Sequence, residues 1–216
     1  MGTSQINSNL ISALEWRYAT KKFDPKKKVA EGDIQQILRA VQLAASSYGF
    51  QPYKVFVVSD PELKARLHPA AYNQPQVLDC SHVFVFAHYL DFSAADVRQF
   101  LQRKAEVLNV TYDKMEGAEK YLSEQMAKKP SEAMKIWTSR QAYIALGNLL
   151  AACGELRIDA CPMEGFKPDE FGEILGLPQM GLKAVVMATV GYRSEEDKTQ
   201  FVAKVRRSIE DLFVRL

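Results

Sequence analysis

Residues 183–192 read Lys-Ala-Val-Val-Met-Ala-Thr-Val-Gly-Tyr, a nearly continuous apolar run with several β-branched residues. A strand with one wet face alternates apolar and polar residues, whereas a strand covered on both faces stays apolar throughout. The run therefore predicts a strand at the centre of a sheet. Shorter stretches at 54–58, 82–87 and 158–162 predict further strands, about four in all.

Helical patterns occupy more of the chain than strands do. The clearest is a helix ending near residues 46–49, in which Ile34, Ile37, Leu38, Val41 and Ala45 share one face. Other helices are expected at 9–19, 93–127 with a break near 109–111, 131–152 and 168–175, and the tail 201–216 is amphipathic.

Asp60 and Pro61 mark the start of one more short helix, and residues 70–76 are expected to form a loop. Because strands and helices do not alternate regularly, the order predicts an α+β fold rather than a doubly wound sheet. No repeat, low-complexity stretch or flexible linker interrupts the chain, which predicts a single domain over residues 1–216.

The second half of the longest expected helix, residues 143–152, carries no charge at all. A helix that is apolar on every side must be covered on every side. It is therefore central either in the domain or in a dimer.

Composition excludes several classes of function. With 28 Lys and Arg against 26 Asp and Glu, the net charge is +2, which argues against a nucleic-acid partner or an anionic membrane surface. No apolar stretch is long enough to span a membrane, and residues 1–10 lack the apolar core of a signal peptide. The three cysteines, Cys80, Cys153 and Cys161, are best explained as buried thiols of a cytoplasmic protein.

The usual catalytic motifs are also missing. His68, His82 and His88 lack the spacing of a metal site. The sequence has no nucleophile elbow, zinc-protease motif, P-loop or dinucleotide fingerprint, so a hydrolase or a Rossmann dehydrogenase is not expected.

Two basic segments could hold an anion. Arg17 and Lys21 are four residues apart, so on a continuous helix they would share one face. Lys204 and Arg206 are two apart, so on an extended strand they would point the same way. A solvated basic surface is the plainer interpretation of either pair alone.

Two further segments offer main-chain and small polar groups. Residues 45–53 read Ala-Ser-Ser-Tyr-Gly-Phe-Gln-Pro-Tyr and precede a strand, while residues 161–166 read Cys-Pro-Met-Glu-Gly-Phe and follow one. Glycine in the second segment allows a flat ligand to approach the backbone closely. Each segment alone is equally well explained as an ordinary turn.

Taken in order, five segments resemble one family: RYATKKFD from 17, SSYGFQPY from 46, AAYNQPQVLDCSH from 70, PMEGF from 162 and VAKVR from 202. The chain is similar to FMN-dependent NAD(P)H nitroreductases, in particular the oxygen-insensitive nitroreductase and dihydropteridine reductase-like branch. The resemblance runs from about Leu14 to Arg206. It implies an intertwined homodimer with a mainly antiparallel sheet flanked by helices, and two non-covalent FMN sites that take residues from both subunits.

The resemblance also assigns the cofactor site residue by residue. It gives the FMN phosphate to Arg17, Lys204 and Arg206, with Tyr18 and Ala19 beside them, and it places Lys21 at the N1/O2 edge of the ring. It places Ser46, Ser47 and Gly49 against the partner's flavin, Asn73 and Gln76 near the ring, and the loop of Pro162, Met163, Glu164 and Gly165 along it, with the backbone of Glu164 and Gly165 facing N5 and O4.

Three positions depart from the family pattern. Ala19 replaces a frequent serine, Gly49 a frequent asparagine, and Gln76 a second lysine of the best-known relatives, so Lys21 would act on the ring without that second cation. The lid at 106–129 aligns too loosely to carry over any residue.

The activity that the resemblance implies is a ping-pong reaction. NADH or NADPH would reduce the flavin at N5, and a nitroaromatic, quinone or similar flat acceptor would then reoxidise it. Such chemistry needs no catalytic protein residue and no metal. Flavin or dihydropteridine reduction, and a non-catalytic FMN-binding or sensing role, remain as alternatives.

Overall fold

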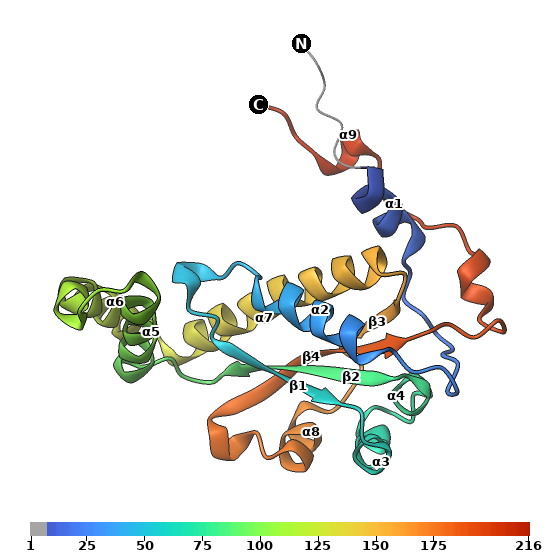
Figure 1. Cartoon of the computed structure of the whole chain (residues 1–216), viewed down its shortest axis with the longest axis horizontal. Coiled ribbons are helices and arrows are strands. Elements are labelled where there is room, and N and C mark those ends of the chain that lie inside the picture. Colours follow the sequence, from blue (N-terminus) through green and yellow to red (C-terminus); the bar gives the residue numbers. More distant parts are fainter. Residues whose placement is uncertain (1–7) are drawn as a thin grey trace.

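A four-stranded antiparallel sheet forms the centre of the computed structural model, which describes residues 8–216 (Figure 1). The strand order is β1-β2-β4-β3, with β1 at Tyr53–Val58, β2 at His82–Tyr89, β3 at Asp159–Met163 and β4 at Leu182–Gly191. All neighbouring strands are antiparallel. The predicted central strand is thus confirmed, as is the α+β class, because β4 has a partner on each side and both of its faces are covered.

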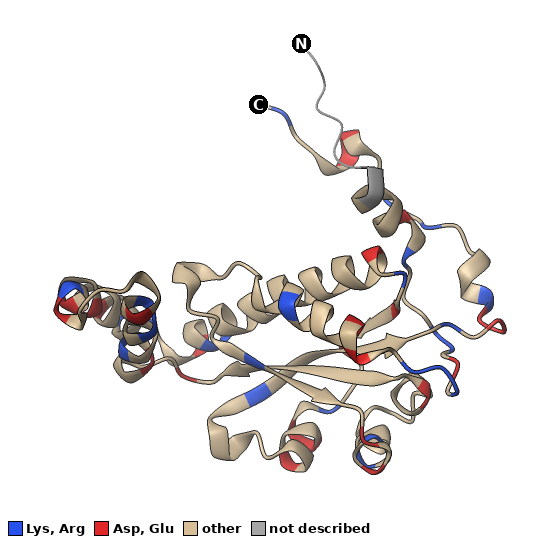
Figure 2. Ribbon diagram, in the orientation of Figure 1, with Lys and Arg blue, Asp and Glu red and all other residues tan. Residues whose placement is uncertain are grey.

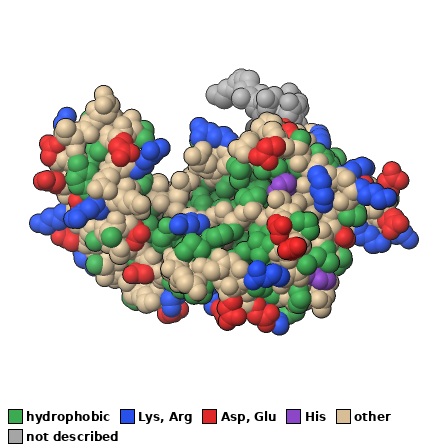
Figure 3. All heavy atoms as spheres, turned by 60° about the horizontal axis from the view of Figure 1, so that its bottom comes forward, with side chains coloured by type: hydrophobic (Ala, Val, Ile, Leu, Met, Phe, Trp, Pro, Cys, Tyr) green, Lys and Arg blue, Asp and Glu red, His purple; other side chains and the backbone are tan. Residues whose placement is uncertain are grey.

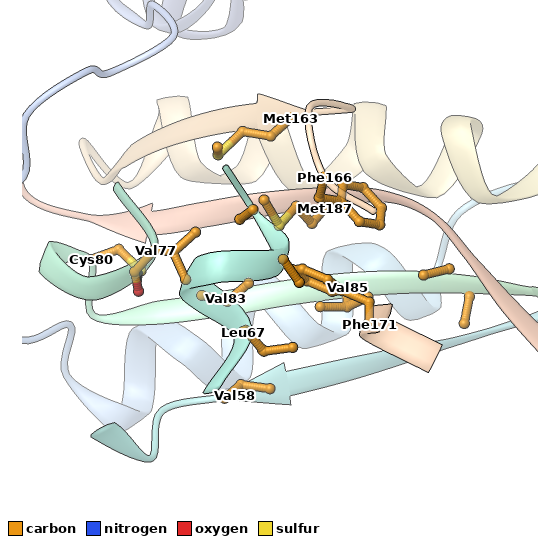
Figure 4. Close-up of a cluster of buried hydrophobic side chains, with 14 of the residues drawn as sticks. Val58, Leu67, Val77, Cys80, Val83, Val85, Met163, Phe166, Phe171 and Met187 are labelled. Carbon is orange, nitrogen blue, oxygen red and sulfur yellow. Dashed lines mark hydrogen bonds between the residues drawn. The ribbon is translucent and has the colours of Figure 1, made fainter. Parts of the chain in front are cut away.

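Helices cover both faces of the sheet. On one face α2 (Glu31–Gln42) and α7 (Ser131–Glu155) pack on Phe84 and Phe86 of β2. On the other face α3 (Pro61–Ala70), α4 (Gln76–Asp79) and α8 (Pro168–Leu175) enclose Val83 and Val85, as Figure 4 shows. Alternate residues of β2 therefore point into two separate cores, which is why this strand contains no charged residue.

Two helices between β2 and α7 project from one end of the sheet, α5 at Ala94–Leu108 and α6 at Glu116–Ala127 (Figure 1). They confirm the predicted break, where Asn109 adopts a left-handed conformation with φ 51°. Figure 3 shows this lobe standing apart from the body across a hollow in which hydrophobic side chains are exposed. A small core that includes Phe50, Phe92 and Leu101 joins the lobe to the body.

Several predicted boundaries need correction. Helix α1 covers Ser8–Trp16 and does not reach Ala19. Helix α7 runs to Glu155, three residues beyond the prediction. The loop expected at 70–76 is shorter, because α3 includes Ala70 and α4 begins at Gln76. Residues 1–10 were predicted to lack the apolar core of a signal peptide. Most of them, residues 1–7, lie outside the described part of the chain.

The tail leaves the sheet and passes beside α1 (Figure 1). It contains α9 (Ile209–Leu212), but every residue of 201–216 is exposed. The amphipathic pattern predicted there therefore has no buried face within one chain. Lys204 and Arg206 lie in a part of the tail that forms neither helix nor strand.

One ion pair keeps the chain extended after α1. Asp159 at the start of β3 accepts hydrogen bonds from the backbone N–H and Nε of Arg193, both at 2.8 Å, and from Thr20 Oγ1 at 3.3 Å. The Arg193 guanidinium lies over the rings of Trp16, at 4.2 Å, and Tyr18, at 4.6 Å. Ala19 then forms a parallel β-bridge with Ala160. A helix through Ala19 would lose these contacts, and α1 accordingly ends at Trp16.

Replacing Asp159 with Asn should destabilise the protein by about 3 kcal/mol, because it leaves a largely buried arginine without its counter-charge. The measurement is the free energy of unfolding from urea titrations. Lys22→Gln is the matched control, because its pair with Glu196 at 3.4 Å is exposed on both sides, and it should have little effect. Equal effects of the two variants would contradict the proposed importance of the buried pair.

Candidate functional site

Three cations from opposite ends of the chain meet beside α1. Arg17 follows α1, while Lys204 and Arg206 lie in the tail after β4. They share a cavity of about 250 Å³, lined by Arg17, Tyr18, Ala19, Thr199, Val202, Ala203, Lys204 and Arg206. Figure 2 shows basic residues along both of these coil segments. The structure thus brings together the three residues predicted to bind a phosphate.

The electrostatics of this cluster favour an anion. Burial lowers the pKa of the Arg17 guanidinium, and the charge of Arg206 lowers it further. Burial likewise lowers the pKa of Lys204, with smaller contributions from Arg17 and Arg206. Mutual repulsion of this kind is relieved when an anion binds between the cations. Among the described residues, Arg17 Nε is also buried without a hydrogen-bond partner, so the protein alone leaves this donor unsatisfied.

The tail reaches Arg17 because Lys204 caps α1. Its Nζ donates to the backbone oxygens of Leu14, at 2.9 Å, and Glu15, at 2.6 Å. These carbonyls belong to the last turn of α1, where a cation is favourable. Arg206 donates only to its own neighbour's carbonyl, that of Val205, and forms no ion pair within the described chain.

Lys21 lies on the other side of Ala19, next to β3. The prediction that Arg17 and Lys21 share a helical face is wrong, because the chain is extended here. Both nevertheless lie near Cys161: Lys21 Nζ is 4.0 Å from its Sγ. Burial raises the pKa of the Cys161 thiol, while the charges of Lys21 and Arg17 partly oppose the rise. Cys80, Cys153 and Cys161 are all buried free thiols, as predicted.

Asp197 anchors the backbone of the Arg17–Lys22 segment. Its Oδ2 accepts from the backbone N–H of Lys21 at 2.8 Å, from that of Lys22 at 3.1 Å and from the Tyr18 hydroxyl at 3.0 Å. Burial alone would raise the pKa of Asp197, but the hydrogen bonds from Lys21, Lys22 and Thr199 hold it below the ordinary value. Burial and the bond to Asp197 raise the pKa of Tyr18 to about 12.

The loop after β3 lies near α4 and the segment around Lys21. Ala19, Val77 and Met163 belong to one hydrophobic cluster, which brings the segments around Lys21, α4 and Pro162–Gly165 together. Glu164 and Gly165 are exposed, and the Tyr143 hydroxyl donates to Glu164 Oε1 at 2.5 Å. Burial and this bond raise the pKa of Tyr143 to about 12. Since its carboxylate is already engaged, Glu164 offers a ligand mainly its backbone.

Asn73 and Gln76 differ in their exposure. Asn73 is exposed in a left-handed conformation with φ 55°. Gln76 is only 6% exposed, and its side-chain oxygen is buried without a donor within the described chain. A buried acceptor with no protein partner is a position where a bound group can donate a hydrogen bond.

The turn with Ser46, Ser47 and Gly49 does not join the other site residues. The Ser47 N–H donates to Gln141 of α7 at 2.8 Å, whereas α1 packs at Gly154, where an added Cβ would lie 3.1 Å from the Ala13 carbonyl. Thirteen residues separate these two points on α7, or about 20 Å along the helix. Gly49 has φ 78°, a left-handed conformation that accounts for glycine there.

Sequence patterns missed three residues that shape the site: Asp197, Arg193 and Gln74. The only local signal was for Asp197, which begins a turn by accepting from the Thr199 N–H at 3.0 Å. Within the described chain no cluster of His, Cys, Asp and Glu could hold a metal ion, and no helix is both long and apolar enough to cross a membrane.

The role of Asp197 predicts a pH dependence. Because its pKa is lower in the folded protein, ionised Asp197 stabilises the fold above the unfolded-state pKa of about 4, and this contribution is lost as the pH falls through the folded pKa. The difference in unfolding free energy between the wild type and Asp197→Asn should be constant above about pH 5 and shrink toward pH 3. Urea titrations across this range measure it, and a difference that stays constant to pH 3 would contradict the assignment.

Comparisons with known proteins agree with this geometry. A sequence model of the Nitroreductase family matches residues 14–192. The major NAD(P)H-flavin oxidoreductase of Aliivibrio fischeri is 34% identical over 214 residues, which cover 96% of this chain and 98% of that protein.

Solved structures share the fold. A nitroreductase-like protein from Streptococcus mutans has a TM-score of 0.84 at 22% identity, covering 98% of this chain and all of its own. An Exiguobacterium sibiricum protein solved in complex with FMN has a TM-score of 0.85 at 20% identity, covering 99% of this chain and 100% of its own. Since the family match and the Aliivibrio relative both span most of the sequence, the chain belongs to the nitroreductase family.

Proposed function

We propose that the protein is an FMN-dependent oxidoreductase that takes electrons from NADH or NADPH and passes them to flat electrophiles such as nitroaromatics and quinones. The observation that carries the proposal is the cluster of Arg17, Lys204 and Arg206 around a cavity, with a buried guanidinium nitrogen that has no partner within the described chain. Support comes from the relative named an NAD(P)H-flavin oxidoreductase and from the FMN complex of a protein with the same fold.

The residues present fit this cofactor. The cationic cavity, with a volume of about 250 Å³, suits a phosphate. Lys21 lies beside Cys161 of β3, and Glu164 and Gly165 follow the end of that strand, where a ring attached to the phosphate would extend. When bound, FMN would supply the hydride-transfer chemistry.

The protein's own contribution is binding and charge. Arg17 and Arg206 hold the phosphate as planar forks, while Lys204 also fixes the tail to α1. Lys21 places a positive charge beside the ring, which favours the more negative reduced state. Tyr143 and Glu164 are paired with each other, so neither is assigned as a general acid, and the reaction is proposed to be ping-pong at a single open face.

A second acceptor class has specific support. The Aliivibrio relative is named for flavin reduction, and free flavin is also flat and electrophilic. We therefore include flavin reductase activity in the proposal. Comparing the oxidation of NADH and NADPH with a nitroaromatic, a quinone and free FMN as acceptors tests both, and a protein that binds FMN but oxidises neither nucleotide would instead be a binding or sensing protein.

We also propose that the working unit is a homodimer, with the whole chain acting as one cytoplasmic domain. The outer face of α7 exposes Ile136 and Ile144, the latter by 45%, although the opposite face is buried. The tail exposes Phe201, Val202, Val205, Ile209, Leu212, Phe213 and Val214. Exposed apolar area of this extent is typical of an interface. A second subunit would also bring its Ser46–Ser47 turn to a cofactor that this chain's own turn cannot reach.

The dimer proposal makes a direct prediction. Ile144→Lys should convert the protein to a monomer at micromolar concentration and weaken FMN binding, because it places a charge in the centre of an apolar interface expected to exceed ~2,000 Å². Light scattering and FMN fluorescence titration measure the two effects. Val57→Lys, on the edge strand β1, is the matched control and should remain dimeric, whereas a monomeric wild type that binds FMN would refute the proposal.

Arg206→Ala should raise the dissociation constant for FMN ten- to hundredfold, since a charge-assisted bond contributes about 1.5–3 kcal/mol. Turnover at saturating FMN should remain close to the wild-type value, because the phosphate is remote from the reacting atoms. Arg207→Ala is the control, since Arg207 is exposed and does not line the cavity. Finding FAD rather than FMN released from the protein would overturn the cofactor assignment.

Lys21→Ala should show the opposite pattern. The flavin potential and the rate of bleaching by NAD(P)H should fall, while FMN affinity changes less, because Lys21 faces the ring and Gln76 adds no second cation. Spectroelectrochemistry and single-turnover bleaching measure these quantities, with Lys22→Ala as control. If Lys21→Ala weakens FMN binding but leaves potential and rate unchanged, Lys21 belongs with the phosphate group instead.

A further inference from the structure

The loop between β3 and α8 contains a tight turn with one outward donor. The Phe166 N–H donates to the Glu164 carbonyl at 2.9 Å, closing a turn around Gly165. The Glu164 carbonyl and the Gly165 N–H belong to the same trans peptide and point in opposite directions. Since that carbonyl points into the turn, the Gly165 N–H points out of it. It donates to no backbone acceptor of the described chain, and Gly165 is exposed.

The side chain of Gln74 holds this turn from the neighbouring segment. Its Nε2 donates to the Gly165 carbonyl at 2.6 Å and to the Ala71 carbonyl at 3.0 Å, so one amide group joins the end of α3 to the loop. The Lys167 N–H donates to the Ala70 carbonyl at 2.8 Å and makes a second link between the same segments. Both hydrogens of the Gln74 amide are therefore used to connect them.

The hydrogen bond from Gln74 to the Gly165 carbonyl controls the orientation of the Gly165 N–H. It restrains the peptide that contains the Gly165 carbonyl and the Phe166 N–H. The turn bond from Phe166 to Glu164 then couples that peptide to the preceding one, which contains the Gly165 N–H. Rotation of either peptide plane would break one of these two bonds.

Glycine at 165 is part of the same arrangement. A Cβ added there would lie 3.3 Å from Gln74 Nε2, closer than an ordinary van der Waals contact. An alanine would therefore push the amide away from the carbonyl that it holds. Glycine at this position therefore allows the Gln74 amide to approach the turn this closely.

We infer that Gln74 is a positioning residue for the cofactor: it touches no reacting atom but fixes the direction in which the Gly165 N–H is offered to the isoalloxazine ring. This inference rests on the proposed FMN function, which places the ring along the loop of Glu164 and Gly165. The donor belongs to the backbone and cannot be removed by substitution, so its alignment depends on the side chain that restrains the turn.

The test compares Gln74→Met with Gln36→Met. Methionine keeps the length of the side chain but donates no hydrogen bond, and Gln36 is an exposed residue of α2 that serves as the matched control. In FMN-free protein, the Phe166 amide should exchange with solvent faster in Gln74→Met, as measured by NMR. Dissociation constants for FMN and for riboflavin should both rise two- to tenfold, and the visible absorption bands of the bound flavin should shift.

Riboflavin separates this inference from the phosphate site, because it has the ring but no phosphate. Arg206→Ala should weaken FMN without changing riboflavin binding, whereas Gln74→Met should weaken both by the same factor. Gly165→Ala, which displaces the Gln74 amide while keeping its side chain, should shift affinity and spectrum in the same direction as Gln74→Met.

Different results would refute the proposed FMN function and the positioning role of Gln74. A wild type that binds neither FMN nor riboflavin refutes the proposed function. A wild type that binds FMN, combined with Gln74→Met that leaves flavin affinity, absorption bands and Phe166 exchange unchanged, refutes the positioning role alone. A variant that loses stability but keeps the wild-type flavin spectrum and affinities would show that Gln74 is only structural, and would also overturn the inference.

Discussion

The buried pair of Asp159 and Arg193 is the contact on which the arrangement of the candidate site depends. It joins the first residue of β3 to the segment that leaves β4, and its guanidinium lies over Trp16 and Tyr18. Because these rings are fixed on either side of Arg17, the chain cannot continue as a helix. Arg17 then turns toward the tail cations, while Lys21 runs along β3 to Cys161. An ion pair remote from the proposed chemistry thus sets the positions of the cations that would serve it.

Charge is distributed unevenly along this site. At one end, Arg17, Lys204 and Arg206 repel each other and have no carboxylate partner within the described chain. At the other end, the Glu164 carboxylate accepts a hydrogen bond from the Tyr143 hydroxyl, and the loop of Glu164 and Gly165 offers main-chain groups. Such a gradient suits a ligand with an anionic tail and a neutral, flat head.

The sequence predicted the sheet and most helices well, because those elements depend on local composition. Residues 168–175 form α8 as predicted, since Pro168 begins the helix and Gly176, with φ 68°, ends it. The first helix was predicted too long because its end is set by Arg193, far away in sequence. Helix α4 was missed because four residues give no periodicity.

In the site, too, residues that act through distant partners could not be predicted from local sequence. The resemblance named residues that would contact a ligand, and the structure brings Arg17, Lys204 and Arg206 together. It did not name Asp197 or Gln74, whose partners are backbone groups 176 and 91 residues away. A side chain that holds a distant peptide leaves no local pattern, because almost any loop residue could be its partner.

Helix α7 connects the fold to the proposed assembly. Its inner face supplies Ala142, Ala145 and Leu149 to one core, and its outer face exposes Tyr143 and Ile144. The absence of charge over residues 143–152 is thus only half explained by a single chain, since a helix with one wet face would be expected to carry polar residues there. The Ser46–Ser47 turn is likewise held at Gln141, about 20 Å along α7 from where α1 packs. A second subunit packed on the outer face of α7 would account for both observations, because it would bury that face and bring a Ser46–Ser47 turn to each cation cluster.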